Sequence, residues 1–320
     1  MITPQYVFGP VPSRRLGRSL GIDIIPRKLC TLDCVYCEVG RTDKRAMRRK
    51  EYLPAGKILT EIKEALTEHD NLDFVTFSGS GEPTLNSALG IMIRGVKAMT
   101  KTPVAVITNG TLLFLEEVRQ DLLEADVVLP SLDAGTVGTF EALNRPHPKL
   151  RHWTIVEGMK FFRREYGGQI WLEILFVEGL NDKDEELYHL KHLVDEINPD
   201  KIQLNTVVRP PAESFARPLD MQALRRIREY FGDACEIIGE LSDEHQKPAK
   251  GSSNAVILAL LRRRAMTVSE LALALECPLG GIMQSLATLQ VQEIVESYIF
   301  RGKKYYRATE YVTNQSMGQG

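Results

Sequence analysis

The sequence is poor in cysteine, in long apolar runs and in excess charge of either sign, and each shortage excludes a class of protein. Only 5 of its 320 residues are cysteine, an odd number that is ill suited to a disulfide framework. No apolar run approaches the ~18 residues needed to span a bilayer, and residues 1–9 lack the basic start and apolar stretch of a secretion signal. We therefore expect a cytoplasmic protein without a membrane segment.

The charge balance and the composition narrow the class further. The formal net charge is −2 and the isoelectric point is about 6.4, which excludes a globally basic nucleic-acid-binding protein. Hydrophobic residues make up 43% of the chain and charged residues 26%, proportions typical of a globular enzyme. The same composition excludes collagen, coiled coil and intrinsic disorder.

Short β-rich runs alternate with amphipathic stretches as far as about residue 240. This alternation predicts an α/β fold with a mainly parallel sheet, in the form of a partial (β/α)6 TIM-like barrel. The expected strands are 20–25, 73–77, 104–107, 127–132, 170–177 and 202–206, with a weaker one at 236–238. The expected helices are 58–69, 86–99, 115–124, 154–166, 184–197 and 220–231. In such folds the ligand lies at the carboxyl ends of the strands, so functional residues should follow each strand.

A change of pattern divides the chain after residue 240. Residues 241–253 are polar and contain Pro, Gly and Ser, which is typical of a linker between a main domain at 1–240 and a second domain. Residues 254–312 are expected to form a winged-helix-like domain of three helices and a hairpin, followed by a flexible tail at 313–320. The expected recognition helix, 279–289, contains no Lys or Arg, so we favour substrate docking or dimerisation over base recognition.

Three of the cysteines, Cys30, Cys34 and Cys37, lie together just after the first expected strand. A closed zinc site usually takes four protein ligands, yet residues 1–29 and 38–68 contain no other Cys or His. Three cysteines on one loop can instead hold a four-iron cluster whose fourth iron takes an external ligand. Structural zinc or buried thiols are the alternative interpretation of this group. Cys235 and Cys277 are expected to be packed side chains rather than ligands.

The C-x3-C-x2-C spacing, with Tyr36 before the last cysteine, resembles the signature of the radical S-adenosylmethionine (radical SAM) superfamily. The resemblance covers roughly residues 9–210. It implies an oxygen-sensitive [4Fe–4S] cluster on Cys30, Cys34 and Cys37, with S-adenosylmethionine on the open iron and a reducing electron donor such as flavodoxin or ferredoxin. One electron would then cleave S-adenosylmethionine, and the resulting 5′-deoxyadenosyl radical would abstract hydrogen from a substrate.

The same resemblance assigns further residues to the S-adenosylmethionine site. Residues 80–82 resemble the Gly-Gly-Glu segment of the superfamily, with serine in place of the first glycine, and imply that Gly81 and Glu82 hold the methionine ammonium. Asn109 would lie near the methionine end, and Ser131 with Asp133 would bind the ribose hydroxyls. Capping of the next helix is the alternative role for this last pair. Four more residues would frame the adenine or the substrate: Glu173, Gln203, Asn205 and Val207.

The substrate is less well defined by the sequence. The runs GEPTL and SLDA resemble the wyosine-synthase-like branch of Fe–S oxidoreductases, which points to tRNA, but no cysteine precedes Cys30 to hold that branch's second cluster. Basic residues flank the expected site at Arg14, Arg15 and Arg18 and between Arg41 and Lys50. They suit tRNA or an anionic, phosphorylated small molecule, with solvated loops as the alternative. His147, in a turn, is expected to be incidental.

Two functions follow from this sequence. The first is a radical SAM enzyme that acts on an unidentified substrate. The competing hypothesis is a non-enzymatic iron–sulfur sensor in which the winged helix binds nucleic acid and cluster loss alters that binding.

Overall fold

The computed structural model describes residues 6–42, 44–238, 254–275 and 277–309. Contacts within the chain form two compact units, with residues 6–238 in the larger and 254–309 in the smaller. The expected linker at 241–253 and the expected tail at 313–320 lie outside the described residues.

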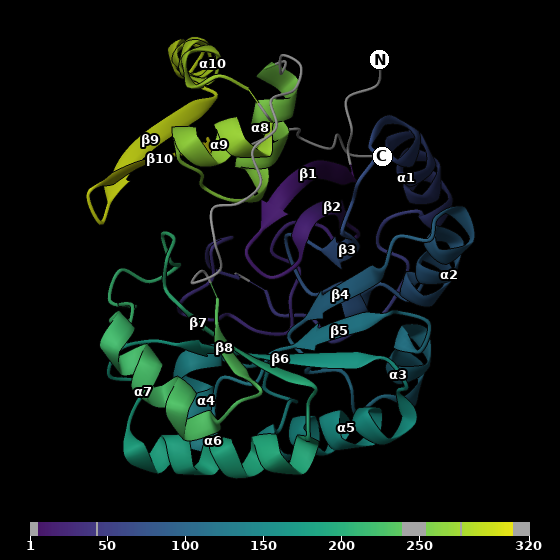
Figure 1. Cartoon of the computed structure of the whole chain (residues 1–320), viewed down its shortest axis with the longest axis vertical. Helices are drawn as coiled ribbons and strands as arrows, with labels where there is room; N and C mark the ends of the chain where they lie inside the picture. The colour runs from purple at the N-terminus through teal and green to yellow at the C-terminus, as the bar shows by residue number, and fades with distance from the viewer. Residues whose placement is uncertain (1–5, 43, 239–253, 276, 310–320) are drawn as a thin grey trace, which may run out of the picture. The chain divides into compact units, whose positions relative to one another are not determined.

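The larger unit is built on an eight-stranded sheet whose spatial order follows the sequence (Figure 1). Its strands are β1 (Val7–Ser13), β2 (Gly17–Asp23), β3 (Phe74–Ser78), β4 (Val104–Thr108), β5 (Val127–Pro130), β6 (Gln169–Phe176), β7 (Lys201–Thr206) and β8 (Cys235–Ile237). β1 is antiparallel to β2, and every later neighbour pair is parallel. This sheet confirms the expected α/β fold of the partial TIM-like type.

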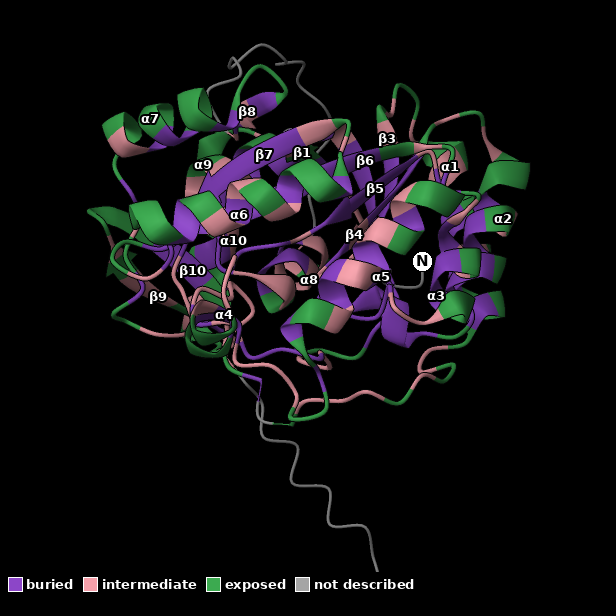
Figure 2. Cartoon of the chain, turned by 90° about the horizontal axis from the view of Figure 1, so that it is seen from below, coloured by how far each residue is buried: buried purple, intermediate pink, exposed green. Residues whose placement is uncertain are grey.

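Helices connect the parallel strands along the outer side of the curved sheet (Figure 1). They are α1 (Ala55–Glu68), the short 3-10 helix η1 (Pro83–Leu85), α2 (Leu89–Met99), α3 (Glu116–Leu122), α4 (Val137–Asn144), α5 (His152–Glu165), α6 (Asp184–Ile197) and α7 (Met221–Phe231). Their exposed stripes face outward and the strands behind them are buried (Figure 2). Because these connections all cross in the same sense, the carboxyl ends of the parallel strands gather at one edge.

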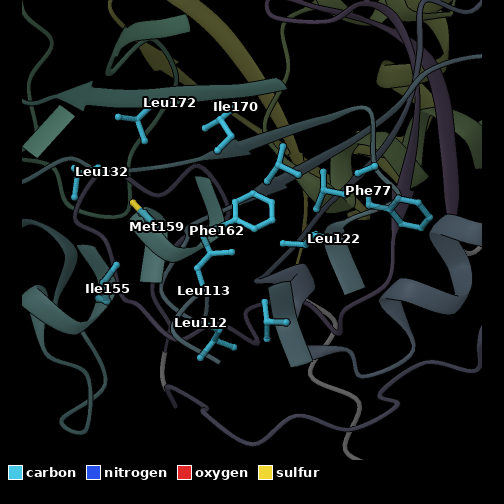
Figure 3. Packing of buried hydrophobic residues seen from close by; sticks show 14 of the residues in the cluster. Phe77, Leu112, Leu113, Leu122, Leu132, Ile155, Met159, Phe162, Ile170 and Leu172 are labelled. Carbon is cyan, nitrogen blue, oxygen red and sulfur yellow. The ribbon is translucent and has the colours of Figure 1, made fainter. Parts of the chain in front are cut away.

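Alternate residues of the strands belong to two separate apolar clusters, as the two-residue period of a strand requires. One set, which includes Val106 and Ile170, packs against helix residues such as Phe162 of α5 (Figure 3). The other set lies on the opposite, inner face of the sheet and contains Leu16, Ala105, Val127, Leu129 and Trp171. Asn109 and Ser131 continue this inner set beyond the strand ends.

The sequence analysis missed three elements of the larger unit: the strand β1, the helix α4 and the short 3-10 helix η1. β1 contains Pro10 and Pro12, which cannot donate ladder hydrogen bonds, but β1 lies at the edge of the sheet, where proline is tolerated. α4 is only 8 residues long and contains Gly138, so its helical pattern is weak. It begins after Thr136, whose side chain accepts a hydrogen bond from the Thr139 N–H.

The smaller unit contains α8 (Asn254–Arg263), α9 (Val268–Ala274), α10 (Leu279–Val291) and the antiparallel hairpin of β9 (Val295–Phe300) and β10 (Lys303–Ala308). This order agrees with the expected helices and hairpin, and the identification as a winged helix stays a prediction. In the parts of the chain that are described, no single helix is long and apolar enough to cross a membrane. α9 and α10 reach that length and apolar content only when taken together, and the pair is bent by 115°.

Candidate cofactor site

The cysteine loop follows β2 and is fixed by backbone hydrogen bonds to the turn after β3. Lys28 N–H donates to the Ser80 carbonyl at 2.7 Å, and Glu82 N–H donates to the Leu29 carbonyl at 2.9 Å. A Cβ atom at Gly81 would lie 2.1 Å from the Leu29 carbonyl oxygen. Glycine is therefore required at position 81 by the close approach of the two backbones.

The three cysteines of the loop are partly buried, and two of them accept hydrogen bonds from asparagine side chains. Asn109 Nδ2 lies 3.4 Å from Cys30 Sγ, and Asn144 Nδ2 lies 3.4 Å from Cys34 Sγ. Burial raises the pKa of Cys30 to about 12, and it also raises the pKa values of Cys34 and Cys37. The charge of each of the other two thiols adds to the rise at Cys34, so the three sulfurs lie within electrostatic range of one another.

This donor set fits an iron–sulfur cluster better than a single ion. Among the described residues, no three Cys, His, Asp or Glu side chains converge tightly enough to hold one metal ion. In a cluster each thiolate binds a different iron, so the sulfurs need not meet at a point. The N–H groups directed at two of the sulfurs are the kind of hydrogen bond that tunes such clusters. The single-zinc alternative has no such support in the described residues.

Glu82 is buried, and its carboxylate is already held by the protein. Oε1 accepts hydrogen bonds from the Thr84 N–H at 3.0 Å, the Thr84 hydroxyl at 2.7 Å and the Thr108 hydroxyl at 2.6 Å, while Oε2 accepts one from the Asn109 N–H at 2.7 Å. Burial raises the pKa of Glu82, and these hydrogen bonds oppose the rise. Glu82 therefore ties the turn after β3 to the end of β4 and positions Asn109. Its contact with a methionine ammonium stays a prediction.

Asp133 lies at the centre of a second buried network. Its Oδ2 accepts hydrogen bonds from the Tyr36 hydroxyl and from Asn144 Nδ2, the latter at 2.9 Å, and its Oδ1 accepts one from the Leu175 N–H at 2.9 Å. Burial raises the pKa of Asp133 to about 6, against the effect of these donors. The alternative role for Ser131 and Asp133 as helix caps is wrong, because α4 is capped by Thr136.

A pocket brings four of the predicted residues together: Tyr36, Asn109, Ser131 and Asp133. Asn144 and Leu32 also line it, whereas Gly81 and Glu82 lie outside its lining. The pocket adjoins the cysteine loop, since Leu32 and Tyr36 belong to that loop. The structure thus groups the predicted cofactor residues as a pocket wall, with Glu82 and Gly81 as its support.

Two functional asparagines were missed by the sequence analysis. Asn144 connects Cys34, Tyr36 and Asp133, and Asn181 donates from Nδ2 to the Asp133 carbonyl at 2.8 Å. Asn144 ends α4, which was not anticipated, and it comes well after the strand whose end it serves. The run Asn144-Arg145-Pro146 was the signal available in the sequence, since proline punctuates a turn there.

Most of the basic residues that flank the loop have internal partners. Arg45 donates to the carbonyls of Arg145 and Pro146, both at 2.9 Å, and Arg49 donates to the Thr84 carbonyl at 2.8 Å and forms an ion pair with Asp121. These arginines hold the loop in place. Lys44 and Arg48 are the exposed members of the segment between residues 41 and 50 that carry no side-chain partner among the described contacts.

The matches to known proteins agree with this geometry. Residues 24–190 match the Radical SAM superfamily, and the chain belongs to that superfamily. The chain is therefore a radical SAM enzyme, and its cofactors are those of the family, a [4Fe–4S] cluster and S-adenosylmethionine. The expected kinship with the wyosine-synthase-like branch stays a prediction.

Within the superfamily the chain is most informatively compared with proteins of the UPF0026 group. It is 37% identical over 235 residues to UPF0026 protein MJ1312 of Methanocaldococcus jannaschii, and the aligned stretch covers 73% of this chain and 72% of that protein. It is 33% identical over 277 residues to a UPF0026 protein of Helicobacter pylori, with 85% and 89% covered.

Two further matches are partial. A protein named GTPase Obg from Brachyspira hyodysenteriae is 37% identical over 305 residues, but this chain spans only 45% of that protein's length. This sequence does not contain G-x-x-x-x-G-K-[ST], the phosphate-binding loop motif of many nucleotide-binding proteins. A radical SAM methyltransferase from Sphaerobacter thermophilus has a similar fold, with a TM-score of 0.55 and 18% identity over 68% of this chain and 65% of that one.

Proposed function

We propose that this enzyme reductively cleaves S-adenosylmethionine at a [4Fe–4S] cluster bound by Cys30, Cys34 and Cys37, and abstracts hydrogen from an anionic substrate. When bound, the cluster supplies one electron that breaks a carbon–sulfur bond of S-adenosylmethionine, giving a 5′-deoxyadenosyl radical. The observation that carries the proposal is the set of three neighbouring, partly buried cysteines, two of which accept asparagine N–H groups.

The protein's own groups have distinct roles in this proposal. Asn109 and Asn144 direct N–H donors at Cys30 and Cys34, which stabilises the negative charge of deprotonated sulfur. Tyr36, Ser131 and Asp133 lie together beside the cysteine loop, and they would contact S-adenosylmethionine bound at the cluster. Glu82 holds the end of β4 through the Asn109 N–H, and Gly81 allows the turn after β3 to pack closely against the cysteine loop. Together they would keep Asn109 in a fixed position relative to the cluster.

The substrate class has two candidates, tRNA and a phosphorylated small molecule. An RNA methyltransferase RlmN of Thermotoga sp. is 28% identical over 59% of this chain, and the chain covers 55% of that protein, which is the support for RNA. The partly buried Arg14 and Arg209, which lie beside the cysteine loop, support a phosphorylated small molecule as the substrate. The electron donor in this proposal is a flavodoxin or a ferredoxin.

The proposal is tested by comparing two cysteine variants after anaerobic reconstitution. Cys34→Ala should lose the cluster and all cleavage, because a thiolate ligand is missing. Cys235→Ala, which changes a buried cysteine of β8 outside the loop, should retain about four irons per chain. Iron content and the visible absorption spectrum provide the measurement. Retention of the intact cluster in Cys34→Ala would contradict the ligand assignment.

Product analysis of the reconstituted wild-type chain tests the reaction itself. With dithionite and S-adenosylmethionine, the chain should form 5′-deoxyadenosine and methionine. A reconstituted chain that holds its cluster and never consumes S-adenosylmethionine would contradict the reaction and favour the sensor hypothesis.

A further inference from the structure

The turn between β1 and β2 carries two arginines into the concave inner side of the sheet. Leu16 anchors this turn, since its side chain is 2% exposed and packs with Ala105, Val127, Leu129 and Trp171. Arg14 and Arg15, which precede it, consequently lie beside β6 and β7. Both were treated in the sequence analysis only as parts of a basic flank.

Arg15 is neutralised by a close partner in this position. It forms an ion pair with Glu173 of β6, whose side chain is 9% exposed. The other oxygen of Glu173 accepts a hydrogen bond from Asn205 Nδ2 at 2.8 Å. Arg15, Glu173 and Asn205 thus form a complete polar group that faces inward from β6 and β7.

Arg14 differs from Arg15 because its contacts are long. Its Nη2 lies 4.0 Å from Glu38 Oε1, and its Nη1 lies 3.5 Å from Asn205 Oδ1. Hydrogen bonds to charged groups are normally about 2.7–2.9 Å long. The Arg14 side chain is only 29% exposed, so this guanidinium has lost much of its water, and it gains no close carboxylate among the described residues.

A second guanidinium approaches the same carboxylate. Arg209, with a side chain 9% exposed, places Nη1 3.3 and 3.4 Å from the two oxygens of Glu38. Both guanidiniums approach the Glu38 carboxylate, and burial together with the charge of Arg209 lowers the pKa of Arg14. Glu38 follows Cys37 directly in the sequence, so this pair of arginines adjoins the cysteine loop.

We propose that Arg14 and Arg209 bind the phosphate group of a small-molecule substrate. This deepens the proposed function, on which it rests for the reaction performed. Arg14 approaches Glu38 only at 4.0 Å, whereas a phosphate group has enough oxygen atoms to take a bidentate contact from Arg14 and another from Arg209. Both guanidiniums are recessed, which suits a single terminal phosphate and not the continuous backbone of RNA. The exposed Lys44 and Arg48 would serve the latter.

Glu38 has a defined part in this site. Its carboxylate lies 4.0 Å from Arg14 Nη2 and 3.3 Å from Arg209 Nη1. A phosphate group competes with this carboxylate and is repelled by it. Removing the charge of Glu38 should therefore strengthen phosphate binding, an effect that loss of a structural ion pair would not produce.

The test is a calorimetric titration of the anaerobically reconstituted full chain with inorganic phosphate, and with acetate at equal ionic strength. Wild type should bind one phosphate saturably and acetate more weakly. Arg14→Gln and Arg209→Gln should each weaken phosphate binding by about tenfold, and Glu38→Gln should tighten it a few-fold. Arg48→Gln, in the exposed basic segment, is the matched control and should bind phosphate as wild type does.

Several results would overturn the assignment. The first is that Arg14→Gln binds phosphate as tightly as wild type does. The second is that Glu38→Gln binds phosphate no more tightly than wild type does. The third is that wild type binds acetate as tightly as phosphate. A short single-stranded RNA that binds wild type more tightly than phosphate and is lost in Arg48→Gln would also overturn it, in favour of RNA. If Arg14→Gln fails to fold, Arg14→Lys keeps the charge and should still weaken binding, because it lacks the planar fork.

Failure of this site is distinguishable from failure of the proposed reaction. Phosphate binding is measured without S-adenosylmethionine, and 5′-deoxyadenosine formation is measured without phosphate. Cleavage of S-adenosylmethionine by a chain that binds no phosphate rejects only the phosphate site. Phosphate binding by a chain that never cleaves S-adenosylmethionine rejects only the reaction.

Discussion

At the scale of single residues, Gly81 is the most tightly constrained position of the candidate site. A Cβ atom there would lie 2.1 Å from the Leu29 carbonyl oxygen and 2.6 Å from a methyl carbon of Ile25. The Leu29 oxygen cannot move away without breaking the hydrogen bond that it accepts from the Glu82 N–H. One added methyl group therefore acts on the cysteine loop and on Glu82 together.

Gly81→Ala should destabilise the chain by about 1–3 kcal/mol, the usual range for overpacking, and should lower cluster occupancy after reconstitution. Gly138→Ala is the matched control, because a Cβ at Gly138 meets nothing within 4 Å and the residue lies in α4. It should leave occupancy unchanged and stabilise α4 by up to about 1 kcal/mol. Chemical denaturation and iron content provide the measurements. Full iron occupancy in Gly81→Ala would show that the loop tolerates the shift.

Residue spacing revealed the cysteines but not the groups that support them. Cys30, Cys34 and Cys37 are close in sequence, so their common loop could be predicted. Asn144 reaches Cys34 across 110 residues and Arg209 reaches Glu38 across 171, and only the folded sheet brings such pairs together. Asn144 also depends on α4, whose short and glycine-containing sequence gives a weak helical signal.

At the scale of elements, the turn between β1 and β2 joins the apolar inner face to the proposed phosphate site. Leu16→Ala should destabilise the chain by about 2–5 kcal/mol, since it leaves a cavity among Ala105, Leu129 and Trp171. It should also weaken phosphate binding, because Arg14 lies on the same turn. Ile91→Ala on α2, at a side chain 56% exposed, should change stability by less than about 0.5 kcal/mol. Equal effects of the two substitutions in denaturant titrations would contradict the packing role of Leu16.

The start of α5 should make stability depend on pH. His152 is buried, its Nε2 lies 2.8 Å from the Ala134 carbonyl, and burial lowers its pKa below the ordinary 6.5. The folded chain thus binds the proton less readily than the unfolded chain. The contribution of His152 is complete above pH 6.5 and is lost as the pH falls from there through the lowered pKa.

Denaturant midpoints of wild type and His152→Gln across the pH range from 8 to 5 check this expectation. The difference between the two chains isolates the histidine from Asp133, whose raised pKa acts in the opposite direction. The advantage of wild type should shrink toward acid pH. A difference that is constant with pH would mean that His152 does not titrate differently in the folded and unfolded chains.

Period and composition predicted most elements of the sheet correctly, and the exceptions have physical reasons. The parallel strands are nearly continuous apolar runs, because both of their faces are covered, and they were found. β1 was missed because its prolines are compatible only with an edge, and a strand's place in a sheet is a property of the tertiary fold.

At the scale of the whole molecule, every predicted cofactor residue, with the partners described above, lies between residues 6 and 238. A chain that ends at Ile238 should therefore fold, bind about four irons and cleave S-adenosylmethionine without residues 239–320. Circular dichroism, iron content and 5′-deoxyadenosine formation provide the measurements. Loss of iron binding by this soluble fragment would show that the second unit contributes to the cofactor site.

Among the described residues, the strand order of the larger unit ends at two edge strands, β1 and β8. Unpaired sheet margins invite aggregation, because another chain can add a strand to them. β1 has prolines at positions 10 and 12, which have no N–H to offer, and β8 is only 3 residues long. Both edge strands therefore discourage the addition of a strand from another chain, a hazard that is greatest while the sheet is still forming.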